Sequence, residues 1–148
     1  PIVTLYDLLR KNINFMQSML YVLAQILGAI AGTISANLMF NSGATQLSTN
    51  DRYSSGSFIG EVLATFGLIM VISLKPNKAA FLVPAWIGSA YFFTSSTAFA
   101  NPAVTLGRIF TDSFAGISIS SVLPFIAAQL LGMLLMLLIR DRLTESNS

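Results

Sequence analysis

The chain of 148 residues is 54% hydrophobic and only 9% charged, with a mean hydropathy of +0.72, whereas a soluble domain carries roughly 25% charged residues. It contains no histidine and no cysteine, which excludes disulfides, thiol chemistry, metal clusters built on these residues and the usual general base. A formal net charge of +2 is too small and too dispersed for a nucleic-acid site. We therefore expect a lipid bilayer as partner, and no nucleic acid, metal ligand, cofactor or catalytic residue.

Four long apolar segments are candidates for membrane-crossing helices. In chain order they cover residues 14–40, 57–74, 79–93 and 119–139. A crossing needs about 20 mostly apolar residues, so the third segment is long enough only if it continues into the polar run at 94–97. Residues 41–56 form a polar loop between the first two segments, and we expect the polar residues after Arg142 to fray.

The basic residues predict how the chain is oriented. If the four segments alternate in direction, most of the eight lysines and arginines fall on one side, namely Arg10, Lys11, Lys75, Lys78, Arg140 and Arg142. Short loops rich in Lys and Arg stay in the cytoplasm. We therefore expect the loop 41–56 outside the cell and residues 143–148 as a cytoplasmic tail.

The chain contains an internal repeat. Pro1-Ile2-Val3-Thr4-Leu5 is echoed by Pro102-Ala103-Val104-Thr105-Leu106, and each copy is followed by Ala-Gln-x-x-Gly, at residues 24–28 and 128–132. Repeats in apolar chains are typical of transport folds built from two related halves. We expect residues 1–40 to end the first repeat and residues 57–142 to form the second.

The segments that begin with proline are too short to cross a membrane. Residues 101–114 provide about four turns, with Asn101 as a preferred N-cap and Pro102 at the first helical position. Because they lie between two crossing segments, we predict a re-entrant loop that returns as a half-helix. The repeat predicts a second half-helix at residues 1–11, entering from the opposite face, so that two positive helix ends meet at mid-membrane.

The chain resembles the major intrinsic protein family, the aquaporins and glycerol facilitators, over essentially its whole length. The resemblance is carried by these segments, by the Ala-Gln-x-x-Gly motifs and by Glu61-x-x-x-Thr65-Phe66. In that family two Asn-Pro-Ala boxes begin two half-helices that meet mid-membrane. Asn101-Pro102-Ala103 matches the second box, and Pro1-Ile2 resembles the first with its Asn cut off and Ile2 in place of Ala.

The resemblance implies an all-α membrane protein with an aquaporin-like inverted repeat. Four transmembrane helices and two re-entrant half-helices would be present here, out of six plus two in the parent channel. Because the chain begins inside the first box, we expect two further helices and an Asn before Pro1. We also expect the 148 residues alone not to conduct.

The resemblance also implies which residues form the constriction. Counting from Asn101 as the family does, constriction positions fall at Ser89, Ala98 and Val104, and a fourth lies in the missing second helix. Val104 stands where the family usually has Arg, so the constriction is expected to be wide and uncharged. This pattern resembles a bacterial branch associated with arsenic resistance. The expected solutes are glycerol-like polyols, metalloid hydroxides such as arsenous acid, and water.

Most of these residues also have an ordinary structural interpretation. Asn101 could only cap its helix, Val104 could be plain packing, and Ser89 could bond back to its own helix. We favour pore roles for all three. For Asn101 the reason is that a polar cap at membrane depth is otherwise expensive, and for Val104 it is the place at the third helical position.

The resemblance implies that Glu61 is a buried brace for re-entrant backbone amides, although a proton-relay carboxylate is the alternative. Gln25 and Gln129 are expected to bridge helices. Arg108 and Asp112, four residues apart, are expected to form an ion pair, and the alternative is that Arg108 adds positive charge to the vestibule.

A passive channel is the favoured function, with a secondary transporter built on an inverted repeat as the alternative. The transporter is disfavoured because Glu61 stands alone among the apolar segments, without a second acid to bind a coupling ion. An enzyme is not expected, since no nucleophile–base pair can be built. The resemblance further implies a homotetramer with one pore per subunit in the cell (inner) membrane.

Overall fold

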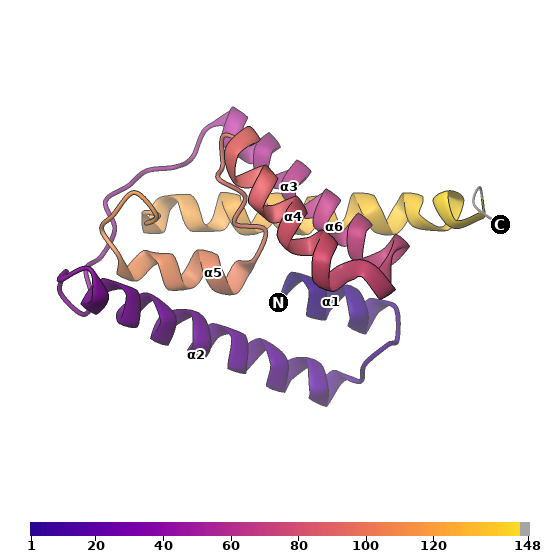
Figure 1. Ribbon diagram of the computed structural model, residues 1–148, viewed down its shortest axis with the longest axis horizontal. Coiled ribbons are helices and arrows are strands. Elements are labelled where there is room, and N and C mark those ends of the chain that lie inside the picture. The colour runs from indigo at the N-terminus through magenta and orange to yellow at the C-terminus, as the bar shows by residue number, and fades with distance from the viewer. Residues whose placement is uncertain (146–148) are drawn as a thin grey trace.

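Helices make up all the regular structure in the computed structural model, which describes residues 1–145 (Figure 1). The six α-helices are α1 Ile2–Leu9, α2 Phe15–Met39, α3 Ser55–Leu74, α4 Ala79–Phe93, α5 Pro102–Gly107 and α6 Ile119–Glu145. Two short 3-10 turns, η1 Pro76–Lys78 and η2 Arg108–Phe110, precede α4 and follow α5. The predicted all-α membrane fold is confirmed.

Side-chain caps fix where several helices begin. Asn14 and Gln17 form a reciprocal capping box at the start of α2, and Ser54 and Ser57 form another at the start of α3. The Asn101 side chain accepts hydrogen bonds from the first turn of α5, as expected from its place before proline. Each cap satisfies backbone N–H groups that would otherwise lack partners at a helix end.

Three helices of the described residues are long and apolar enough to cross a membrane: α2, α3 and the part of α6 from Ile119 to Arg140. The predicted fourth crossing, α4, has only 15 residues. The expected continuation into residues 94–97 does not occur, because Thr94 is extended and ends the helix. At 1.5 Å per residue α4 is about 22 Å long, shorter than the hydrocarbon core.

Two other predicted boundaries were wrong. The second half-helix was expected to continue to residue 114, but helical structure ends at Phe110 because Thr111 is extended. The chain was expected to fray after Arg142, but α6 continues to Glu145. The rest of the expected tail, residues 146–148, lies outside the described residues.

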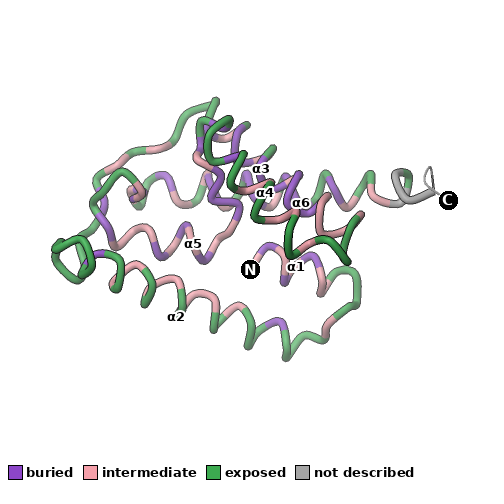
Figure 2. Tube along the Cα trace, viewed as in Figure 1, coloured by how far each residue is buried: buried purple, intermediate pink, exposed green. Residues whose placement is uncertain are grey.

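The core lies between α3 and α6, with the loop before α5 buried beside it, as Figure 2 shows. Its fully buried side chains include Ala64 and Ile69 of α3 and Met133 and Met136 of α6. Gly132 permits the close approach of the two helices, because a Cβ there would lie 2.5 Å from the Val62 carbonyl oxygen. By contrast, only Ser18 and Asn37 are buried along the whole of α2.

The two half-helices α1 and α5 lie end to end between α2 and α6, with the N-terminus of each at the centre of the molecule (Figure 1). Gly107 of α5 packs directly on α2, since a Cβ there would lie 2.8 Å from the Ala29 carbonyl oxygen. The loop after α2 then crosses the far end of α5, where the Ser48 amide donates to the Ile109 carbonyl at 2.8 Å. This arrangement places both box sequences beside the same interior space.

Candidate functional site

A cavity of about 440 Å³ lies where the two half-helices meet, and we call it the box cavity. Pro1, Ile2 and Val3 from the start of α1 line it, and so do Ala100 and Asn101 at the start of α5. Aliphatic side chains of α3 and α4 form most of the remaining wall, with Gln25 of α2. Of the other two predicted box residues, Ala103 is buried and neither it nor Pro102 lines the cavity.

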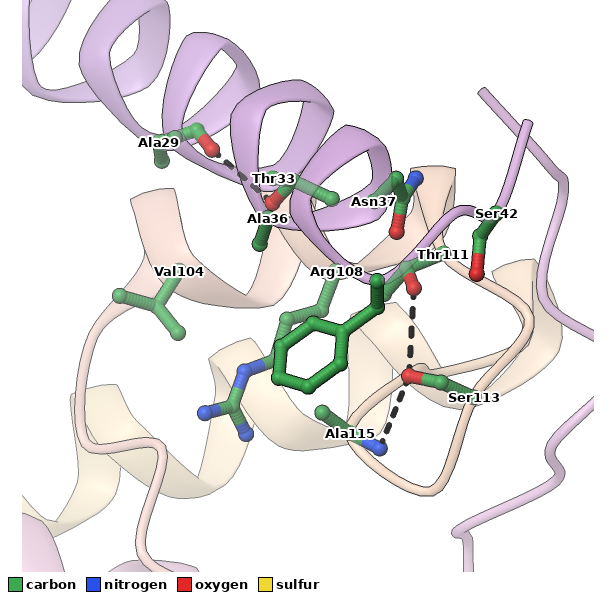
Figure 3. Close-up of a pocket in the computed structure, with 12 residues that line it drawn as sticks. Ala29, Thr33, Ala36, Asn37, Ser42, Val104, Arg108, Thr111, Ser113 and Ala115 are labelled. Carbon is green, nitrogen blue, oxygen red and sulfur yellow. Dashed lines mark hydrogen bonds between the residues drawn. The ribbon is translucent and has the colours of Figure 1, made fainter. Parts of the chain in front are cut away.

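A second cavity of about 380 Å³ lies between α2 and the outer end of α5 (Figure 3). We call it the arginine cavity, because Arg108 is the only ionisable side chain among the described residues that line it. Its α2 wall consists of the small residues Ala29, Gly32, Thr33 and Ala36, followed by Asn37 near the end of the helix. Val104 lines both cavities and therefore lies where they adjoin.

The other two predicted constriction residues lie outside both cavity walls. Ser89 is exposed on α4, and its hydroxyl donates to the Ala85 carbonyl at 2.8 Å, which is the back-bonding that was the alternative for this residue. Ala98 is buried, and its amide donates to Ser96 Oγ at 3.1 Å. The described structure therefore brings only Val104 of the three into contact with the cavities.

The two ends of the Asn101 side chain have different surroundings. Oδ1 accepts from the Ala103 amide at 2.9 Å and from the Val104 amide at 3.5 Å, so it caps α5. Nδ2 donates to no described residue, and the half-buried side chain faces the box cavity. The cap and a donor for a solute are therefore carried by different atoms of one residue.

The loop that leads into the second box has an unusual backbone. Thr97, Ala98 and Ala100 have φ angles of 60°, 48° and 47°, in the left-handed region that favours glycine. Each such residue costs roughly 1–2 kcal/mol, so the loop must be held from outside. Arg52 supplies one contact, because its Nη1 donates to Thr97 Oγ1 at 3.3 Å.

Glu61 of α3 holds the same loop by accepting hydrogen bonds from its backbone amides. Its Oε2 accepts from the Phe99 amide at 3.1 Å, and its Oε1 accepts from the Ala100 amide. Gln129 donates to Glu61 Oε1 at 2.8 Å. Both carboxylate oxygens thus have protein donors, the side chain is fully buried, and it lines neither cavity. This geometry matches a brace and gives a proton relay no path to the cavities.

Each of the two repeats contains a hydrogen bond between a glutamine and a threonine at equivalent positions. Gln25 of α2 donates to Thr4 of α1 at 2.8 Å, and Gln129 of α6 donates to Thr105 of α5 at 3.0 Å. In the sequence repeat Thr4 corresponds to Thr105 and Gln25 to Gln129. Each long helix is therefore tied to its half-helix by the same glutamine–threonine contact.

Arg52, in the loop before α3, was missed by the sequence analysis. Its Nε donates to the Gly116 carbonyl at 2.6 Å and its Nη2 donates to the Phe114 carbonyl. Burial lowers the pKa of Arg52 from its usual value. No short-range pattern could have indicated this residue, because the partners of its side chain lie 45 or more positions along the chain.

The expected ion pair between Arg108 and Asp112 was wrong. Helical structure ends at Phe110, so the two residues are not on adjacent turns of one helix. The Asp112 carboxylate instead accepts from the Thr49 amide at 2.9 Å and from its hydroxyl at 3.1 Å. The Arg108 guanidinium lies over the Phe99 ring, 4.2 Å from its centroid.

Comparison with known proteins gives the family. The sequence model described as Major intrinsic protein matches residues 1–98. Aquaglyceroporin AqpS of Rhizobium meliloti (strain 1021) is 40% identical over 136 residues, covering 89% of this chain and 58% of the relative. Probable aquaporin PIP2-2 of Oryza sativa subsp. japonica is 31% identical over 129 residues, covering 72% of this chain and 44% of the relative.

The chain thus spans between two-fifths and three-fifths of the length of these relatives. No solved structure matches it significantly. Because the family model matches most of the chain, and the box sequences lie together in the structure, this multi-pass membrane chain belongs to the major intrinsic protein family.

Proposed function

We propose that these residues form part of a passive transmembrane channel for small neutral solutes. The observation that carries the proposal is the pair of adjoining cavities, with Val104 between them. One of them is faced by Nδ2 of Asn101, which donates to none of the described residues. A solute would move from the arginine cavity past Val104 into the box cavity. There Asn101 would donate a hydrogen bond that partly replaces a lost water.

The residues that line the two cavities favour uncharged, oxygen-rich molecules as the permeating solutes. The box cavity is mainly aliphatic and has Gln25 and Asn101 as its polar side chains, which suits a molecule with both carbon and hydroxyl groups. Val104 leaves the junction apolar where the family usually has Arg. We therefore propose glycerol-like polyols, metalloid hydroxides such as arsenous acid, and water. The name of the Rhizobium meliloti relative, an aquaglyceroporin, supports this class.

A secondary transporter built on the same inverted repeat is less well supported. Coupling to an ion gradient requires ligands for that ion beside the solute. Glu61 is the only acid in the apolar part of α3, and protein donors occupy both of its oxygens. It is therefore not arranged to bind a coupling ion at either cavity wall.

The remaining features of the proposal follow the family resemblance. Residues 1–40 would end the first repeat, residues 41–56 would be an extracellular loop, and residues 57–142 would form the second repeat. The channel would be a homotetramer in the inner membrane, with the C-terminal residues 143–148 in the cytoplasm. Basic residues at the turn between α3 and α4 and at the end of α6 support this orientation.

Osmotic swelling of proteoliposomes tests the function. The protein is expressed at the full length that its gene encodes, and the 148-residue chain is assayed beside it. We expect the full-length protein to move glycerol linearly with concentration and independently of ion gradients, and the 148-residue chain to be silent. Saturable flux that follows a Na⁺ or H⁺ gradient would support the transporter instead. No glycerol flux from a correctly inserted protein would refute the channel.

A further inference from the structure

We propose that Arg108 determines specificity in this pathway, supplying positive charge and hydrogen-bond donors one helical turn away from Val104. The inference rests on the proposed channel function and assigns its selectivity to a particular side chain. Val104 and Arg108 line the same cavity, and Figure 3 shows the Arg108 side chain extending away from its helix on the side toward Val104. Neutral polyols and neutral metalloid hydroxides would be accepted there, and cations would be repelled.

The first support is that no acid among the described residues forms an ion pair with the Arg108 side chain. The Arg108 side chain forms no hydrogen bond or ion pair with any other described residue, and Asp112, the expected partner, is engaged by Thr49. Its contact is with the Phe99 ring, 4.2 Å from the guanidinium carbon. A cation–π contact holds the group in place without using a protein acceptor. The N–H donors of Arg108 are therefore left for a solute in the cavity.

The contrast with Arg52 identifies which arginine is available. Arg52 lies against the same ring, with its guanidinium carbon 5.2 Å from the centroid of Phe99. Its side chain, however, donates to two backbone carbonyls, of Gly116 and Phe114, and to the Thr97 hydroxyl. Arg52 is thus committed to holding loops together. Its positive charge still adds to the barrier for cations, since both guanidinium groups adjoin one ring.

The position of Arg108 explains how a channel can lack charge at Val104 and still discriminate. Residues four apart on a helix lie about 6 Å apart along its axis. The donors at Arg108 are thus displaced outward by one turn, and the junction at Val104 keeps the width that an apolar side chain leaves. A solute would meet the arginine first, then the apolar junction, and then the Asn101 donor.

Paired measurements on the full-length protein test the proposal. Cation currents are recorded in planar bilayers under a NaCl gradient, and glycerol flux is measured by liposome swelling. Arg108→Gln removes the charge but keeps a hydrogen-bonding side chain. We expect its cation conductance to rise about tenfold or more, because a unit charge in a partly desolvated site acts strongly on an ion. Lys78→Gln, which removes an exposed charge that lines neither cavity, should leave the conductance unchanged.

Arg108→Lys separates charge from the planar donor group. Because lysine keeps the charge on a flexible stem, we expect cation exclusion within about twofold of the parent and several-fold lower glycerol flux. Arg108→Lys also serves if Arg108→Gln does not reach the membrane. Leakage from Arg108→Lys, or an electrically silent Arg108→Gln that assembles normally, overturns the proposal while leaving the channel intact. A parent that moves no glycerol overturns the channel function and this assignment together.

Discussion

Glu61 and Gln129 form a fully buried pair, with Nε2 of Gln129 2.8 Å from Oε1 of Glu61 and neither side chain exposed. The same Gln129 amide group reaches Thr105 of α5. Because Glu61 also binds two amides of the loop before α5, these contacts link α3, α6 and the second box. The alignment of that box depends on a polar network at the centre of an apolar bundle.

Replacing Glu61 with Ala should destabilise the protein strongly. The Phe99 and Ala100 amides would lose their acceptor, and a buried donor left unpaired costs about 1–3 kcal/mol. We expect a loss on the order of 3 kcal/mol in unfolding in detergent, with faster hydrogen exchange at both amides. Glu61→Gln keeps one acceptor oxygen, so its stability should fall between that of the parent and that of Glu61→Ala. Unchanged exchange at residues 99 and 100 in Glu61→Ala would contradict a bracing role.

Gly107→Ala should push α5 away from α2. The added Cβ would lie 2.8 Å from the Ala29 carbonyl oxygen, where backbone cannot move aside cheaply. Overpacking of this kind costs about 1–3 kcal/mol. The matched control is Gly88→Ala, since a Cβ at Gly88 meets nothing within 4 Å. Thermal unfolding of the two variants in the same detergent tests the contact, and equal melting temperatures would rule it out.

Val104→Arg should narrow the junction between the two cavities and charge it. The new arginine would also repel Arg108, one helical turn away. Because the junction becomes narrower and charged, we expect glycerol flux to fall about tenfold while water flux falls less. Val104→Thr has nearly the same shape and should stay close to the parent. Liposome swelling with glycerol and under an impermeant osmolyte gives the two fluxes. If the Arg variant moves glycerol as fast as the parent, Val104 does not lie on the pathway.

Asn101→Asp should make the channel leak protons or small cations. An aspartate keeps an oxygen to cap α5, so the helix start is preserved, but its other oxygen accepts and carries charge where Nδ2 could donate. Asn101→Ser, which also caps helices, serves as the uncharged control. Currents under a pH or Na⁺ gradient distinguish the variants. If Asn101→Asp assembles normally and stays silent, the ion barrier lies elsewhere on the pathway.

Much of the architecture could be predicted because local chemistry determines it. The Asn101-Pro102 start of α5 and the apolar length of α2, α3 and α6 are properties of short stretches, and the structure contains them as expected. The internal repeat also predicted the shared environment of the two boxes, because equivalent sequences occupy equivalent places.

The failures came from places where distant parts of the chain decide the outcome. The ion pair of Arg108 with Asp112 assumed a continuous helix, but the chain leaves the helix at Thr111 and Asp112 turns to Thr49. The 15 residues of α4 end at Phe93 because the next residues turn into a loop that Glu61 and Arg52 hold. Such contacts over 38 or more positions leave no periodic signal in the sequence.

Cavity lining and core packing are carried by different helices, the first by α2 and the second by α3 and α6, and this separation has a consequence for evolution. Most residues of α2 that line the arginine cavity are small, and α2 contributes little to the buried core. A larger or smaller side chain at Thr33 or Ala36 would alter the space for solute without disturbing the packing of Met133 or Ile69. If the proposed channel function holds, substitutions on one helix can therefore change which solutes fit, while two other helices maintain the stability of the fold.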